Sequence, residues 1–373
     1  MSNSQDFREP ATYKITVDGD EIEDLYIYLS SVKVETSRNS SSICTLTFDA
    51  VRTDDTAWNI QDAGIFEPWK EFKIEADFGD YSEEIMRGYI RSIKADSPEQ
   101  MGEAKVTVIC QDETLILDRE HMRKTWSRED EPMTDGEIAQ EIAAENNLDV
   151  EAEDGLTNIT LNQDSTYIRL LRDRAEANGY ECYVRESKLI IQPPQLDEDP
   201  QPSIMVYSGE RTNCLSFSVT HDGHRPDNVS VIRAAETGIE MEQETFSPNL
   251  TLLGSQAATS DNAGLVPFAW QTRRPSGGSL EEANARAQAK ANENAWKLKA
   301  KGELDGSLYG HVLLTHKLVG VYGVGETYSG LYYVDTVTHI FDQSAYRQSF
   351  KLLRNATGQD TEPESEDSLS AVR

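Results

Sequence analysis

The feature that most constrains the fold is an alternation of apolar and polar residues with period two, which recurs in two separate blocks of the chain. Because successive side chains of a strand point to opposite faces, each alternating segment presents one apolar face. About six such strands predict an antiparallel sandwich or barrel rather than a parallel sheet. In the first block, residues 11–114, the segments are TYKITV, SICTLTF, FKIEADF, EIMRGYIRSI and KVTVICQ.

The second block follows a stiff polar connector, PPQLDEDPQP at Pro193–Pro202, which is the clearest boundary in the chain. Its strands are predicted in LSFSVT, DNVSVIRA, LYGHVLL, HKLVGVYGVG, GLYYVDTVTHIF and YRQSFKLLR. Residues 88–114 and 330–357 resemble each other, because each holds a Gly-aromatic strand that turns into a second alternating strand. This internal similarity favours a duplicated module.

A small α/β insert is predicted between the blocks. Thr134 and Glu137 form a capping box that opens one helix, and a second helix over residues 165–178 ends at Gly179. A hairpin then turns near Glu186 and Ser187. The expected fold is therefore mainly β with an α+β insert: two similar antiparallel β-barrel domains and a small domain of two helices and a hairpin.

Two further segments complete the expected organisation. Residues 246–278 are rich in Ser, Thr, Asn, Gly and Pro and are predicted to form a long loop. Ser279 and Glu282 open an Ala-rich helix over residues 279–301, whose alanines recur every four residues and permit close packing. The predicted domains are a first barrel at 1–118, the insert at 119–194, a second barrel at 195–356 and a disordered acidic tail at 357–373.

The charge of the chain excludes several classes of protein. The 373 residues carry 66 acidic and 35 basic side chains, a formal net charge of -31, whereas nucleic-acid and anionic-lipid binding need clustered Lys and Arg. A halophilic source, an acidic channel wall that repels a polyanion and an ordinary solubilising surface each account for such an excess. The first ten residues, MSNSQDFREP, have no apolar core and are not expected to be a secretory signal, and no stretch reaches the ~18 consecutive apolar residues of a membrane span. The four cysteines lie far apart and are expected to be buried apolar side chains.

Few residues suggest chemistry. His221 and His224 have a spacing that suits a metal, with Asp222 and Asp227 nearby, although a polar loop between two strands explains the same residues. His339 is expected to be a hydrogen-bonded strand histidine. The glycines of residues 320–330 open no helix and so lack the geometry of a phosphate loop. We therefore assign no catalytic, cofactor-binding or metal-binding residue, and expect no enzymatic activity and no cofactor.

The closing segment, residues 319–355, resembles the late-control D family, the baseplate hub proteins of contractile phage tails and related contractile injection systems. The matching positions form a Ser-Gly-x-Tyr-x-Val pattern followed by a His and an aromatic-led strand ending in Arg: Ser329, Gly330, Tyr332 or Tyr333, Val334, His339, Tyr346, Phe350 and Arg354. Residues 164–194 are similar to the insert of that family, and RGYIRSI and VICQDET to the end of its first barrel.

The resemblance implies a homotrimeric ring in the virion tail baseplate or an extracellular injection particle, assembled in the host cytoplasm. Two similar barrels in each of three subunits would adapt a threefold central spike to a sixfold tail tube around a channel for DNA or effectors. The implied partners are other copies of the chain, a separate spike protein, the tail tube or a tube-initiator protein, and baseplate wedge proteins. Sequence-specific nucleic-acid binding and membrane insertion are not implied.

Three alternatives remain open at the level of sequence. The hub of a non-contractile long tail has a related fold and the same role. A carbohydrate- or receptor-binding β module would need clustered exposed aromatic residues, and the five tryptophans are scattered along the chain. A hydrolase with an unrecognised site would need His221, His224 and an acidic ligand around a bound metal.

Overall fold

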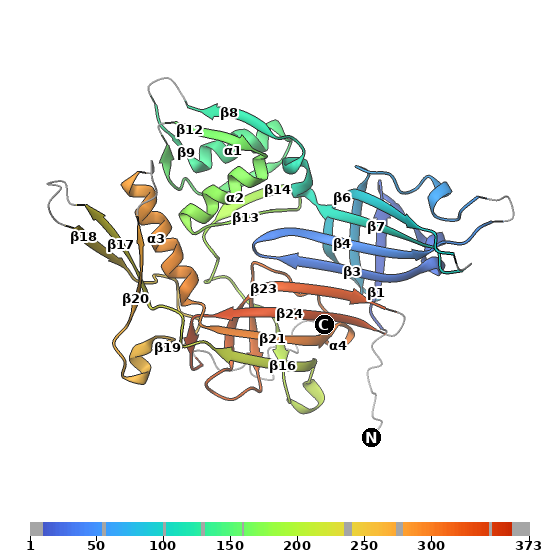
Figure 1. Ribbon diagram of the computed structural model, residues 1–373. Helices are drawn as coiled ribbons and strands as arrows, with labels where there is room; N and C mark the ends of the chain where they lie inside the picture. Colours follow the sequence, from blue (N-terminus) through green and yellow to red (C-terminus); the bar gives the residue numbers. More distant parts are fainter. Residues whose placement is uncertain are drawn as a thin grey trace.

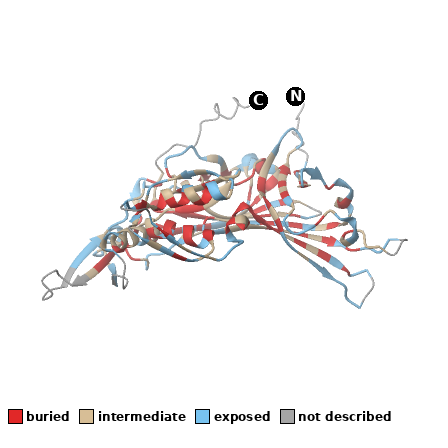
Figure 2. Cartoon of the chain, turned by 90° about the horizontal axis from the view of Figure 1, so that it is seen from above, coloured by how far each residue is buried: buried red, intermediate tan, exposed pale blue. Residues whose placement is uncertain are grey.

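The computed structural model describes residues 10–53, 57–99, 102–127, 131–158, 160–234, 241–273, 279–342 and 345–359. As predicted, the fold is mainly β, with a large sheet and few helices (Figure 1). Buried residues concentrate along the strands and the inner faces of the helices, while loop tips are exposed (Figure 2). No helix in the described part of the chain has the length and apolar character needed to span a membrane.

Six main strands form the first β portion, because apolar residues alternate with polar residues along each of them and so give each strand one apolar face. Inward side chains such as Ile15, Cys44, Ile74 and Val108 are fully buried in one core. One strand of this portion, β3, was not predicted. The strands are β1 (Thr12–Val17), β3 (Leu29–Ser37), β4 (Ser40–Asp49), β5 (Glu71–Asp77), β6 (Ser82–Asp96) and β7 (Lys105–Asp112), with a short β2 (Asp20–Glu21).

The second β portion also has six main strands. Their inward side chains, among them Ile204, Val321 and Leu352, form a second buried cluster. The strands are β15 (Gln201–Met205), β16 (Cys214–His221), β21 (Leu298–Asp305), β22 (Leu318–Tyr322), β23 (Gly330–Phe341) and β24 (Tyr346–Arg354).

The two portions share one strand order. When the six strands of each are numbered along the chain, their order across the sheet is 2-3-6-5-4-1 in both portions. One pairing differs, because β1 runs antiparallel to β5 whereas β15 runs parallel to β22. The expected duplication is present in the topology, and we refer to the portions as the first and second repeats.

The residue registers repeat as closely as the strand order. The fifth strand has a bulge at Arg91 in the first repeat and at Asp335 in the second, and the second strand has a bulge between its first and third residues in both. A bulge is a specific local feature, so its recurrence at two matching places supports a common origin. We call residues equivalent when they hold the same place in both registers. Tyr89 is then equivalent to Tyr333, which means that Gly88 and Gly330 are not equivalents.

At one place in the core the second repeat has a smaller side chain than the first on one strand and larger side chains on the two neighbouring strands. Gly302 stands where the first repeat has Leu46, and two phenylalanines stand where it has valines. A Cβ on Gly302 would clash with the backbone carbonyl oxygen of Ser216 and lie 2.5 Å from the ring of Phe350, so the glycine leaves room for both. The two matching sets are Leu46, Val32 and Val108, and Gly302, Phe217 and Phe350.

The repeats are not separate barrels, because hydrogen bonds join them into one sheet of 13 strands. β23 of the second repeat pairs antiparallel with β3 of the first, with His339 opposite Val34 and Val337 opposite Thr36. All four of these side chains are buried. The expectation of two similar β modules therefore holds, with the addition that they share a continuous backbone wall.

The insert lies beside the turn that joins β3 to β4 (Figure 1). The capping box of Thr134 and Glu137 opens its first helix, and Gly179 ends the second with a positive φ of 72°, both as predicted. The predicted hairpin turns at Glu186 and Ser187 and gains an unpredicted parallel partner, β10. The elements are α1 (Asp135–Glu145), α2 (Tyr167–Asn178), β8 (Met122–Trp126), β9 (Met133–Thr134), β10 (Asp149–Ala152), β11 (Thr157–Asn158), β12 (Leu161–Ser165), β13 (Glu181–Arg185) and β14 (Lys188–Gln192).

The predicted loop over residues 246–278 is wrong in part. Within it β20 (Ala269–Arg273) pairs with β17 (Asn228–Ala234), which also pairs with β18 (Met241–Phe246), and β19 (Gln256–Ala257) pairs with β25 (Ala356–Thr357). This small three-stranded sheet buries apolar side chains only toward one helix, so its sequence remains polar enough to resemble a loop.

The Ala-rich helix is shorter than predicted. α3 spans Leu280–Ala295, not 279–301, and residues 298–305 form β21 because Leu298, Ala300 and Leu304 alternate toward the core. Its alanine stripe packs on Val229 and Val231 of the small sheet rather than between the repeats.

The predicted strand LYGHVLL is also wrong. α4 (Gly306–Tyr309) occupies its start, capped by Asp305, whose carboxylate accepts hydrogen bonds from the N–H groups of Ser307 and Leu308, both 3.0 Å long. Most of the predicted disordered tail, residues 360–373, lies outside the described residues.

Candidate functional site

The structure does not bring the candidate metal ligands together. His221 is exposed at the end of β16, and Asp222 accepts a hydrogen bond from the N–H of His224 within a turn. Asp227 is buried and binds the ammonium group of Lys297 instead. Within the described ranges, no three His, Cys, Asp or Glu side chains are placed to share a metal ion.

His339 lies in the core. Its side chain is fully buried, and its Nδ1 lies 2.9 Å from the hydroxyl of Tyr346. Burial lowers the pKa of His339 to about 3, so the ring is neutral near pH 7. The glycine-containing segment after β22 is a turn with positive φ at Gly323 and Gly325, and it leads into β23 rather than into a helix. Neither feature forms a reactive site.

The most elaborate polar cluster lies where the two repeats and the insert meet. Arg38 follows β3 and is 7% exposed, yet it contacts three carboxylates from three other elements. Its guanidinium lies 3.4 Å from Asp335 of β23, 3.1 Å from Glu293 of α3 and 3.5 Å from Glu181 of β13. Burial opposes the charge, but the three carboxylates together raise the pKa of Arg38. Arg38 therefore links the first repeat to every neighbouring part.

Glu181 extends this cluster into the second repeat. Its Oε2 lies 2.8 Å from Nδ1 of His316 and accepts a hydrogen bond of 2.7 Å from the hydroxyl of Tyr333. Burial alone would raise the pKa of Glu181, but these partners and Arg38 lower it. Burial lowers the pKa of His316, whose ring stacks on Tyr183 at 3.8 Å. A charged group this deeply buried is stable only while its partners stay in place.

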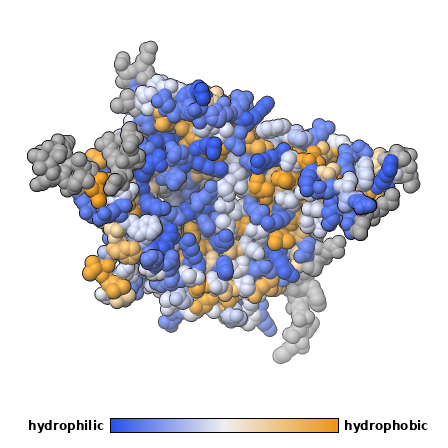
Figure 3. Space-filling model, viewed as in Figure 1, coloured by the Kyte–Doolittle hydropathy of each residue, from blue (hydrophilic) through white to orange (hydrophobic). Residues whose placement is uncertain are grey.

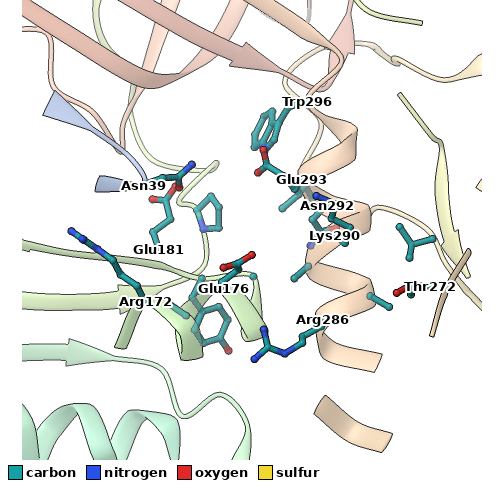
Figure 4. A pocket seen from close by; sticks show the side chains of 18 of the residues that line it. Asn39, Arg172, Glu176, Glu181, Thr272, Arg286, Lys290, Asn292, Glu293 and Trp296 are labelled. Carbon is teal, nitrogen blue, oxygen red and sulfur yellow. The ribbon is translucent and has the colours of Figure 1, made fainter. Parts of the chain in front are cut away.

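A cleft of about 820 Å³ opens beside this cluster, between α2 and β13 on one side and α3 on the other (Figure 4). Many of the charged side chains in it already have partners, for example Arg286, which lies 3.0 Å from Glu282. In the described part of the chain no histidine lines the cleft, and burial raises the pKa of Cys182 to about 12, so its thiol stays protonated. Among the lining residues that the structure describes, no nucleophile is paired with a base.

The face of the large sheet opposite its core carries both signs of charge. Over β3, β4, β7, β21, β24 and residues 92–96 of β6, the charged side chains that alternate with core residues are seven basic and five acidic, although acids outnumber bases in the chain. Apolar patches interrupt the hydrophilic surface in the view of Figure 3. The charged residues of this sheet face are the basic Lys33, Lys94, Lys105, Lys299, Lys301, Arg347 and Lys351, and the acidic Glu35, Asp49, Asp96, Glu303 and Asp305.

Sequence reasoning missed the Arg38 cluster, and no local signal could have revealed it. Arg38, Glu181, His316 and Asp335 have no common spacing and come together only because β3 pairs with β23 and the insert packs on both.

Comparison with known proteins finds a matching family model and several solved structures of similar fold. A family model described as the Alg8 N-terminal domain matches residues 8–343. The structure is similar to the 43 kDa tail protein of prophage MuSo2 from Shewanella oneidensis, with a TM-score of 0.67 at 13% identity over 93% of this chain and 99% of that one. It is also similar to the tail protein from Neisseria meningitidis MC58, with a TM-score of 0.66 at 11% identity over 93% and 97% of the two chains.

A third similar structure comes from a secretion system. The E. coli c3393 protein, described as a component of the type VI secretion system with structural similarity to the T4 bacteriophage tail proteins gp27 and gp5, has a TM-score of 0.52 at 10% identity over 92% of this chain and 76% of that one. A search of curated proteins finds no match to the sequence. The structural similarities show a shared fold.

Proposed function

We propose that this chain, which belongs to the Alg8 N-terminal domain family, is a structural protein of a contractile phage tail or a related injection device. In this proposal it forms a homotrimeric hub ring that adapts a threefold spike to a sixfold tail tube and surrounds the channel for DNA or effectors. It acts in the tail baseplate or in an extracellular injection particle, after assembly in the host cytoplasm. Its role is mechanical, without catalysis.

The observation that carries the proposal is the repeated module. Strand order, register and two bulges recur in the two repeats, so three copies would supply six nearly equivalent units around an axis. A sixfold tube could then meet six similar surfaces, while a threefold spike meets three identical chains. The similarity to two tail proteins over almost their whole length is consistent with this role.

In this proposal the chain has the domains that were predicted from the sequence. Residues 1–118 are the first repeat, 119–194 the insert and 195–356 the second repeat. The Arg38 cluster suits a mechanical part, because it ties these three pieces together through buried charges. The partners are the central spike protein, the tail tube or a tube-initiator protein, and baseplate wedge proteins.

In this proposal the face of the large sheet opposite the cores of the two repeats lines the channel. That face carries seven basic and five acidic side chains, so the expected acidic channel wall finds no support there. A wall of mixed charge still avoids a continuous attractive surface for a polyanion.

The first test is the mass of the purified chain in solution, measured by light scattering coupled to size-exclusion chromatography at several protein and salt concentrations. We expect a species of three chains of 41.8 kDa each, and a ring with six lobes in negative-stain electron microscopy. A monomer under every condition, including after addition of the spike protein, would contradict the proposal.

A further inference from the structure

Each repeat has a fifth strand that changes partner at its bulge. In the second repeat, β23 pairs with β22 before Asp335, and after it residues 336–341 pair with β3 of the first repeat. In the first repeat, β6 pairs with β5 as far as Tyr89. After its bulge at Arg91, residues 92–96 pair with β7 on one side, and no described strand pairs with the other side. β6 therefore has an open edge where β23 has a neighbour.

A matching open edge lies at the far end of the sheet. β16 is the equivalent of β3, and among the described strands it pairs only with β21. The N–H of Asp222 points toward β21, where it donates to the carbonyl of Lys297. Because N–H groups alternate sides along a strand, those of Val219 and His221 point to the open edge.

Burial supports the view that both edges lack a neighbour. At the junction of β23 and β3, Val34 and His339 are fully buried. Their equivalents at the open edges are Val219, which is half-buried, and Ala95, which is exposed. Phe217 is likewise half-buried, whereas its equivalent Val32 is 1% exposed. Residues that are buried at the β23–β3 junction therefore have more exposed equivalents at the two open edges.

We propose that the open edge of β6 in one copy pairs antiparallel with the open edge of β16 in a second copy. The register is that of the occupied junction, which places Ala95 opposite Val219 and Lys94 opposite Thr220. This inference rests on the proposed ring, and it assigns the residues that close that ring. Three copies of the eight strands from β16 to β6 would then form one continuous wall of 24 strands.

The charges at the junction within the chain and at the proposed junction between copies both favour pairing, but the acid and the base exchange places. Within the chain, Asp335 at the bulge of β23 pairs with Arg38, which follows β3. At the open edges, Arg91 stands at the bulge of β6, and Asp222 follows β16 next to the equivalent of Arg38. An ion pair between Arg91 and Asp222 of another copy would take the place of the internal one.

The test is a disulfide across the proposed junction. Thr220 directs its N–H toward β21, so Lys94 and Thr220 would form a pair without mutual hydrogen bonds, in which Cα atoms approach to about 4.5 Å. Such a separation suits a disulfide. Both side chains are exposed, and the four native cysteines are buried. We expect the oxidised variant Lys94→Cys/Thr220→Cys to give covalent trimers on non-reducing gels that revert to monomers with reductant.

The matched control moves one cysteine by two residues. In Lys94→Cys/Ser218→Cys the two positions are diagonal neighbours about 7–8 Å apart, so we expect at least tenfold less cross-linking. Equal cross-linking of the two variants, or none in a preparation with the mass of three chains, would overturn the strand pairing and leave the ring intact. A preparation that is monomeric throughout would overturn both the pairing and the ring.

Discussion

Arg38 and Asp335 contact each other twice, once through their side chains at 3.4 Å and once through a backbone hydrogen bond of 2.9 Å from the Arg38 N–H to the Asp335 carbonyl. The two residues belong to different repeats. Asp335 is the bulged residue at which β23 leaves β22 and joins β3. The bulge therefore both redirects the strand and presents a carboxylate to the arginine of the next module.

Replacing Arg38 should destabilise the chain strongly. In Arg38→Met the carboxylate of Glu181 stays buried without its cation, and such a loss costs about 3–5 kcal/mol. Urea unfolding followed by tryptophan fluorescence measures this change. Arg123→Ala is the control, because Arg123 is 83% exposed and pairs with Asp164 at the surface, where an ion pair contributes at most about 1 kcal/mol. Similar losses in both variants would show that the cluster does not stabilise the fold.

Reversing Arg91 should weaken assembly and leave the subunit folded. Arg91 is exposed and donates one hydrogen bond of 3.2 Å to Gln111, so Arg91→Asp should lower the free energy of unfolding by about 1 kcal/mol, while two acids would face each other at the proposed junction. We expect at least a tenfold weaker self-association by sedimentation velocity. The double variant Arg91→Asp/Asp222→Arg restores opposite charges and should recover most of the loss. A double variant as weak as the single one would argue against this contact.

The effects of substitutions at Gly302, Phe217 and Phe350 on stability should be coupled, because the glycine makes room for the Phe350 ring. Gly302→Leu places a side chain against the ring of Phe350, and overpacking of this kind costs about 1–3 kcal/mol or more. Adding Phe217→Val and Phe350→Val recreates the set found in the first repeat and removes the ring contact, but the contact with the Ser216 carbonyl remains, so it should recover part of the lost stability. Thermal unfolding of the single and triple variants measures the coupling. A triple variant less stable than the single one would mean that the two cores are not interchangeable at this place.

The buried His339 should make stability depend on pH. Burial lowers its pKa from 6.5 to about 3, so below pH 6.5 the unfolded chain binds a proton that the folded chain does not. The free energy of unfolding should therefore fall with pH between 6.5 and about 3, by about 1.4 kcal/mol per pH unit from this group. His339→Gln keeps a polar partner for Tyr346 and removes the titration. Urea unfolding at pH 7, 6 and 5 should give a shallower slope for the variant, and equal slopes would contradict this role.

Alternation of side chains identified most strands of the large sheet, because a half-buried strand leaves a direct pattern in the sequence. β3 was missed although Val32 and Val34 alternate correctly, since its third inward residue is Thr36 and the apolar signal is short. β20 was missed because its partner β17 lies far back in the sequence and its own residues are mostly polar. Such pairings depend on tertiary contacts.

The functional features also divide into those that a local sequence pattern predicts and those that depend on tertiary contacts. The duplicated hairpin of β6 and β7 could be recognised in the sequence, but the register that equates Tyr89 with Tyr333 required the pairing of whole strands. The burial of Glu181 and Arg38 could not be anticipated, because charged residues are buried only where distant segments supply their partners.

The position of the two unpaired edges has a geometric consequence. Because the edges of β6 and β16 are different surfaces, two copies joined through them keep one edge of each kind free, and a twofold dimer cannot satisfy both. In the proposed pairing, addition is head to tail, so the curvature of each subunit decides between a closed circle and an open helical filament. A substitution that flattens the sheet while sparing its edges would therefore produce fibres.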